Sequence, residues 1–231
     1  MNSIRLDRTL ALATGAGMIA TMYGSFLWAP TEKTMGDIQR IFYIHVPSAW
    51  CSFLAFFVVF AASIAYLVTR NLKWDRLALA CAEIGTIFCT GFLASGPLWA
   101  KPVWGIWWTW DARLTSSLIL WLMYLGYLLL RDFLEDSQRR ATLAAVFGIF
   151  AFVDVPIVYL SIRLWRTQHP QPVIMGGEDS GLDPAMFQVF MFSLAVFTVL
   201  FVLLTIIRMR LEKSREEVLQ LRRELMLREF E

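Results

Sequence analysis

Two histidines, His45 and His169, are the only imidazoles in this chain of 231 residues. Imidazole nitrogen is a frequent ligand of iron, copper and zinc. Between the histidines in the sequence, four indoles fall within seven residues: Trp104, Trp107, Trp108 and Trp110. Because indole rings present a flat apolar surface, this combination predicts a site for a planar ligand that carries a metal. The alternative is a membrane anchor, since tryptophans are enriched at both membrane–water interfaces.

The segment IFYIHVPSAW, residues 41–50, places His45 two residues before Pro47. Proline is favoured as the first residue of a helix, because its missing N–H would be unpaired there. We therefore expect a helix to begin at Pro47 and His45 to lie just outside its N-terminus. The positive end of the helix dipole would then favour the neutral imidazole, which is the form that binds a metal.

His169 is followed by several helix breakers, namely Pro170, Pro172 and the pair Gly176–Gly177. These predict an irregular loop. Taken alone, each histidine is more often an interfacial or surface residue than a ligand. As a pair, without a cluster of cysteines or carboxylates, they fit the two axial ligands of haem iron better than structural zinc, which usually takes four protein ligands. We therefore predict both histidines as metal ligands.

A helix over residues 103–111 would gather aromatic and acidic side chains on one face. That face consists of Trp104, Trp107, Trp108 and Asp111, while Trp110 points elsewhere. The predicted cofactor-binding residues are these five, together with Trp99 before the segment and Arg113 after it. The prediction is an amphipathic helix that lies on the bilayer beneath a planar ligand. Four basic residues are candidates to balance ligand carboxylates at the rim: Arg40, Lys101, Arg113 and Arg166.

The elements that position these residues are membrane spans. The chain is 58% hydrophobic with a mean hydropathy of +0.56, which is typical of a polytopic membrane protein. Six apolar segments approach the roughly 20 residues that a helix needs to cross the bilayer: about 10–28, 48–68, 77–96, 114–130, 141–162 and 184–207. No segment alternates like a barrel strand, so the predicted fold is an all-α bundle of six transmembrane helices.

The distribution of lysine and arginine predicts the orientation of these spans. Fifteen of them lie in the N-terminus, the second and fourth connections and the C-terminal tail, and six lie in the other three loops. Positive residues favour the cytoplasm, so both termini are predicted to be cytoplasmic. The loops at about 29–47, 97–113 and 163–183 then face outward, which in a bacterium is the periplasmic side of the inner membrane. Both histidines and the tryptophan cluster lie in these loops.

The tail, residues 208–231, mixes both charges and carries an apolar stripe near heptad spacing: Leu211, Val218, Leu221 and Leu225. This pattern predicts a charged cytoplasmic helix that follows a membrane domain of residues 1–207. The apolar stripe would pack either on the membrane surface or on a partner. Glu83 and Asp154 fall inside predicted spans and are either functional or structural contacts between helices. No phosphate-binding G-x-x-x-x-G-K-[ST] motif is present, so ATP hydrolysis would require another subunit.

The segment WGIWWTWDARLTSSLIL, residues 104–120, resembles the tryptophan-rich WWD signature of the haem-handling superfamily of cytochrome c biogenesis. The six spans, the segment YIHVPSAW at residues 43–50 and a histidine in the last outward loop resemble one family of that superfamily, the haem exporter C (CcmC) family. The resemblance covers essentially the whole chain except the tail after Ile207, for which no match is claimed.

This resemblance implies an outward-facing WWD domain, at about 97–113, that holds haem b transiently between two histidines matching His45 and His169. It implies transfer of that haem to the membrane-anchored chaperone CcmE, where haem becomes attached to a histidine. It also implies an ABC-type complex with the ATPase CcmA and the membrane subunits CcmB and CcmD. No catalytic residue or independent turnover is expected of the chain itself.

The residues alone are also compatible with two other classes of membrane protein. A membrane cytochrome b-type electron-transfer subunit also binds haem, but its ligands commonly lie inside the spans. A small-molecule permease with an aromatic gate would bind no haem. Placement of both histidines at or beyond predicted span ends favours the haem-handling interpretation.

Overall fold

The fold is an all-α bundle in the computed structural model, which describes residues 2–169 and 181–229. The helices are α1 (Asn2–Tyr23), the π-helical turn η1 (Gly24–Trp28), the 3-10 turn η2 (Asp37–Ile41), α2 (Phe42–Thr69), α3 (Leu72–Trp104), α4 (Ala112–Asp132), α5 (Ser137–Phe152), α6 (Asp154–Leu164) and α7 (Pro184–Glu229). Within these residues, six helical segments are long and apolar enough to cross a membrane, which confirms the predicted six-span fold.

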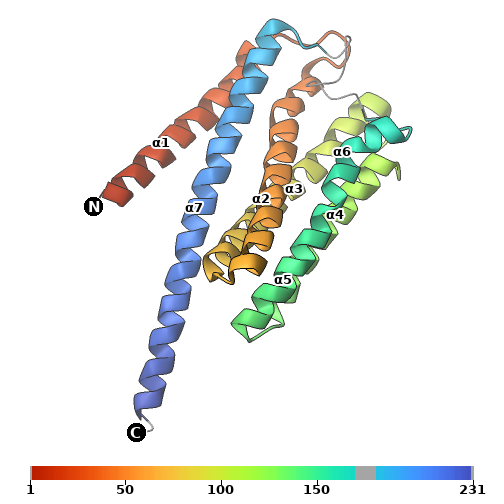
Figure 1. Ribbon diagram of the computed structural model, residues 1–231. Coiled ribbons are helices and arrows are strands. Elements are labelled where there is room, and N and C mark those ends of the chain that lie inside the picture. The colour runs from red at the N-terminus through yellow and green to blue at the C-terminus, as the bar shows by residue number, and fades with distance from the viewer. Residues whose placement is uncertain (1, 170–180, 230–231) are drawn as a thin grey trace.

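The six spans form a bundle in which α2 and α3 are central. Figure 1 shows α1 beside α7 on one flank and α4, α5 and α6 on the other. A Cβ on Gly85 of α3 would lie 2.7 Å from the Cβ of Ala55 on α2, so only glycine allows this close approach. The rings of Phe56 and Tyr124 stack with centroids 3.5 Å apart, which joins α4 to the same core.

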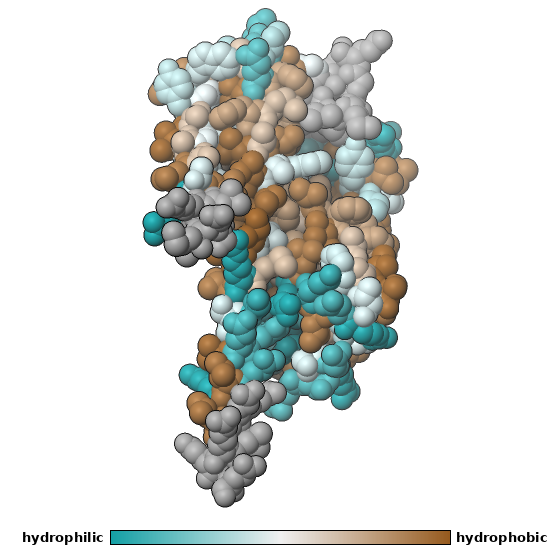
Figure 2. Space-filling view, turned by 60° about the vertical axis from the view of Figure 1, so that its left-hand side comes forward, coloured by the Kyte–Doolittle hydropathy of each residue, from teal (hydrophilic) through white to brown (hydrophobic). Residues whose placement is uncertain are grey.

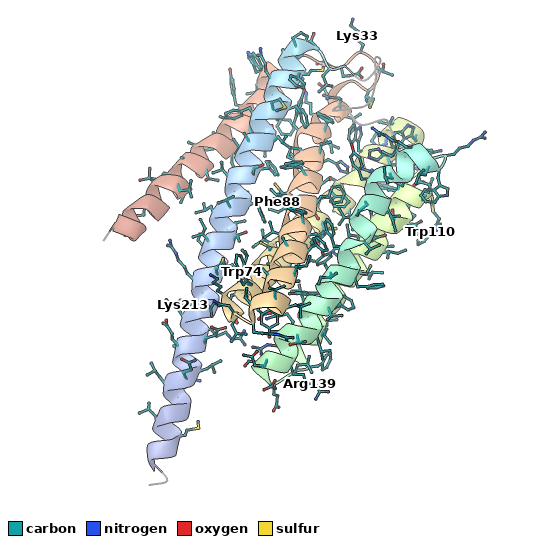
Figure 3. All side chains as sticks on the ribbon, in the orientation of Figure 1. Lys33, Trp74, Phe88, Trp110, Arg139 and Lys213 are labelled. Carbon is teal, nitrogen blue, oxygen red and sulfur yellow. The ribbon has the colours of Figure 1, made fainter. Side chains whose placement is uncertain are left out.

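The two ends of the bundle differ in the connections they carry. The α1–α2 and α3–α4 connections, the end of α6 and the start of α7 lie at the upper end in Figure 1, and the α2–α3 and α4–α5 turns lie at the lower end. Figure 3 places Lys33 and Trp110 toward the upper end and Arg139 and Lys213 toward the lower. The segments that contain both histidines and the tryptophan cluster therefore meet at one end, as the span count predicts.

Ion pairs fasten the helices near the lower end, where hydrophilic residues gather in Figure 2. Arg131 of α4 forms a buried two-pronged ion pair with Asp75 of α3, with Nη2 2.7 Å from Oδ2. Glu83, an acid predicted within a span, accepts hydrogen bonds from Arg208 of α7, one of them 2.8 Å long. Glu83 thus makes a structural contact between two helices.

The fifth span is interrupted where α5 ends at Phe152 and α6 begins at Asp154. The nearby Pro156 lacks the N–H that a continuous helix would use, which accounts for a break one turn before it. Asp154 is buried, and its Oδ2 atom has no hydrogen-bond partner among the described residues. The break directs α6 against α4, the helix that follows the tryptophan-rich segment.

Candidate functional site at the end of the bundle

His45 lies inside the first turn of α2, not outside it, so the predicted helix start at Pro47 is wrong. The helix begins at Phe42, directly after η2, and includes Pro47. Phe42 and Tyr43 are buried against Trp99 and α7. Burial of two aromatic side chains contributes about 2–3 kcal/mol each, which offsets the backbone hydrogen bond that Pro47 cannot donate.

The His45 ring is held on three sides by α3. Its Nδ1 atom lies 2.9 Å from Ser95 Oγ. Its edges contact Phe92 and Trp99, whose ring centroids are 6.1 and 5.7 Å away. A Cβ on Gly96 would lie 3.5 Å from His45 Cε1, so glycine brings the α3 backbone close to the imidazole. His45 is therefore a buried side chain that α3 contacts through Phe92, Ser95, Gly96 and Trp99.

The tryptophan-rich segment is not an amphipathic helix, which corrects the prediction for residues 103–111. Helix α3 continues through Pro97 and Pro102 and ends at Trp104. Gly105 has a φ of 78°, and its N–H donates to the Lys101 carbonyl at 3.0 Å, a left-handed helix cap that glycine adopts without strain. Residues 105–111 then cross to α4 without helical structure, so the tryptophans do not share one helix face.

A groove at this end of the bundle brings the two histidines together. His45 and His169 both line it, with Trp108 and Arg113. The remaining lining comes from three helices: Ala49 and Phe53 of α2, Phe92, Leu93, Gly96 and Pro97 of α3, and Leu114 and Ser117 of α4. The groove therefore reaches down between α2, α3 and α4 rather than lying on the bundle surface.

A second hollow adjoins this groove and is lined by two more tryptophans of the segment. It shares Trp108 and His169 with the first and adds Trp104 and Trp107. Trp108 is the only tryptophan that lines both hollows among the described residues, and its Nε1 atom is buried with no hydrogen-bond partner there. Trp104, Trp107 and Trp108 therefore line one hollow although they do not lie on a common helix face.

The other two candidate tryptophans lie apart from these hollows. Trp110 is 76% exposed and contacts Trp108 edge-on, with centroids 5.8 Å apart. Trp99 is buried and packs on His45 and Phe42. Trp99 therefore packs on the imidazole, and Trp110 lies outside both hollows.

Asp111 caps helix α4. Its Oδ1 accepts hydrogen bonds from the backbone N–H groups of Arg113 and Leu114, at 2.9 and 3.0 Å, and its Oδ2 accepts one from Thr109 at 2.9 Å. This cap ends the tryptophan-rich segment and begins α4 at a fixed place. Trp108 precedes this capped helix end, and Arg113 lies in the first turn of α4.

Replacement of Asp111 by alanine is expected to lower the free energy of unfolding by about 1 kcal/mol, the usual cost of losing such a cap. Asp111→Asn or Asp111→Ser keeps the acceptor and is expected to restore most of it. The measurement is thermal unfolding of haem-free protein in detergent. An unchanged midpoint for Asp111→Ala would contradict the capping role.

The four predicted rim cations differ in their surroundings. Arg113 lies inside the groove and donates to the Val158 carbonyl of α6 at 2.8 Å. Lys101 donates to the Gly105 carbonyl and lies 6.0 Å from the Trp107 ring centroid. Arg40 donates to the Ser25 and Ala29 carbonyls and to the side chains of Thr31 and Asp37. Its N–H groups therefore stabilise the α1–α2 connection. Arg166 is exposed.

His169 is the last described residue before the α6–α7 connection. It is half-buried, and its backbone N–H donates to Thr167 Oγ1 at 3.2 Å. The breakers that predicted an irregular loop, at positions 170, 172 and 176–177, lie outside the described residues. Ser95 and Gly96, which contact His45, escaped the sequence analysis because nothing in their spacing marks them.

Nearly the whole sequence is similar to a family of known proteins. The family model described as "Heme exporter protein C" matches residues 2–224. The chain is similar to heme exporter protein C of Bradyrhizobium diazoefficiens, 39% identical over 90% of this chain and 79% of the relative. It is also similar to that of Escherichia coli K12, 34% identical over 92% of this chain and 87% of the relative. A third relative, from Rhodobacter capsulatus, is 30% identical over 90% and 86%.

Proposed function

Because this chain belongs to the heme exporter protein C (CcmC) family, which handles haem for cytochrome c maturation, we propose that it binds haem in the groove at the end of the bundle and passes it to the chaperone CcmE. The protein is a multi-pass membrane protein. One observation carries the proposal: the only two histidines, 124 positions apart in sequence, line the same aromatic groove.

The donor set supports haem as the bound molecule. Two imidazoles from different elements are the donors that a haem iron accepts at its two axial positions. The tryptophan side chains of the segment, above all Trp108, offer apolar surface for the macrocycle. Arg113 supplies a cation within the groove that can balance a haem carboxylate.

The two histidines are placed differently, which suits a protein that must release its cargo. His45 is fixed in helix α2 between Ser95 and the rings of Phe92 and Trp99. His169 lies beyond the end of α6, outside regular helix. We infer that His45 is the retained ligand and that His169 moves away when haem is passed on. The chain presents haem and performs no turnover of its own.

The groove faces the periplasm from the inner membrane in this proposal, because the opposite end carries most lysines and arginines. The end of α7 beyond residue 207 is then a cytoplasmic extension of the membrane domain. The remaining subunits of the haem-delivery complex are proposed to be CcmA, which would supply ATP hydrolysis, with CcmB and CcmD in the membrane.

Transfer is the test of this proposal. Haem-loaded protein is mixed with CcmE, and haem attached to the chaperone is detected on a denaturing gel. Haem is expected on the chaperone and not on a matched chaperone whose accepting histidine is replaced. A haem that is stably reduced and reoxidised but never transferred would instead indicate a cytochrome b-type electron carrier.

A further inference from the structure

Ser95 stands out because it is the hydrogen-bond partner of His45 within the groove wall. It lies on α3, one turn before Trp99, and its Oγ atom is 2.9 Å from His45 Nδ1. The hydroxyl is also 2.8 Å from the Gly91 carbonyl, one turn earlier on the same helix, and 3.3 Å from the Phe92 carbonyl. A serine hydroxyl has a single hydrogen but two acceptor lone pairs.

These contacts select one tautomer of the imidazole. The carbonyl of Gly91 can only accept, so the Ser95 hydrogen is directed to it. The contact with His45 is then satisfied when Nδ1 carries the proton and donates to Ser95. If Nδ1 were unprotonated, the single hydroxyl hydrogen could be donated either to the Gly91 carbonyl or to Nδ1, but not to both. Both contacts are made at once only by the Nδ1–H tautomer.

We propose that Ser95 is the positioning residue that fixes His45 in the Nδ1–H tautomer and so directs its Nε2 lone pair to haem iron. This inference rests on the proposed haem site. Partners on the second nitrogen commonly orient metal-binding histidines and set their donor strength. Ser95 is a neutral acceptor, so it orients the ring while polarising it less than a carboxylate would, which suits a ligand whose iron is passed on.

The first experiment needs no haem. Selective ¹⁵N-histidine labelling gives only two imidazoles, and a His169→Gln variant assigns the His45 signals. The expected spectrum of the haem-free protein has a protonated Nδ1 and an unprotonated Nε2 on His45. Ser95→Ala is expected to yield a mixture of tautomers, and Ser95→Thr to retain the single form. A His45 that is Nε2-protonated in the unchanged protein would overturn the inference.

The second experiment measures the bound haem. Ser95→Ala is expected to weaken haem binding about tenfold, within the usual effect of losing such a partner, and to raise the haem reduction potential because the imidazole becomes a weaker donor. Ser95→Thr is expected to restore both values. The matched control is Ser48→Ala, which removes a buried hydroxyl whose one hydrogen bond among the described residues is to the Ile44 carbonyl, and it should leave both values unchanged.

These measurements separate the two proposals. An unchanged affinity and potential in Ser95→Ala, with haem still bound through His45, would overturn the role of Ser95 and leave the proposed function intact. Absence of haem binding by the unchanged protein would overturn the proposed function and, with it, the iron-directing role, whatever the tautomer spectrum records.

Discussion

Protein carrying His45→Ala is expected to purify without a haem Soret band, whereas the unchanged protein retains one. The substitution removes the imidazole that Ser95, Phe92 and Trp99 contact within the groove wall, and it leaves His169 as the one remaining histidine of the chain. We expect haem affinity to fall by roughly 100-fold or more, beyond the loss usual when a residue that only orients a metal ligand is replaced. Absorption spectra of protein purified in parallel, normalised to protein concentration, provide the measurement.

A second substitution at the same position supplies the control. His45→Gly leaves a space bounded by Phe92, Trp99 and Gly96, and added imidazole is expected to enter it and restore haem binding. His169→Ala is expected to lower affinity less, since His45 remains in place. If His45→Ala retained the full Soret band, iron would have to be bound elsewhere and the proposed site would be wrong.

Trp108→Ala is expected to produce the second largest effect. Trp108 lines both hollows of the site, so its loss removes apolar surface that a macrocycle would cover. Burial of one aromatic side chain contributes about 2 kcal/mol, which corresponds to a roughly 30-fold weaker haem affinity. Titration of haem into purified protein gives the value.

Trp110→Ala is the matched control, because that indole is next but one in sequence, is 76% exposed and lines neither hollow. Its replacement is expected to change affinity less than threefold, within the effect usual for a surface substitution. Equal losses for both substitutions would mean that the tryptophans act only as a general membrane anchor.

The sequence predicted the fold well because membrane spans are marked by long apolar runs, and a helix is the simplest way to pair the backbone in lipid. The predicted helix ends were less accurate, because the end of a helix depends on a few residues with opposing preferences. Pro47 looked like a helix start, but the burial of Phe42 and Tyr43 extends α2 by more than a turn. A proline alone does not report what the residues before it pack against.

The sequence predicted that both histidines and the tryptophan segment lie at one end of the bundle, but not how these residues are arranged there. Spacing alone placed three tryptophans on one helix, whereas Gly105 in their midst ends α3 in a left-handed cap. That glycine was the available signal for the break. The contact between His45 and Ser95 joins residues 50 positions apart, and it follows from the packing of α2 on α3, which no local pattern specifies.

The most direct test of the account is the electron paramagnetic resonance spectrum of the ferric, haem-loaded protein. Two imidazole ligands from His45 and His169 predict a low-spin spectrum that becomes high-spin when His169 is replaced by alanine and His45 remains. A high-spin spectrum in the unchanged protein, or a low-spin spectrum that persists in His169→Ala, would contradict the claim that the two histidines share one haem.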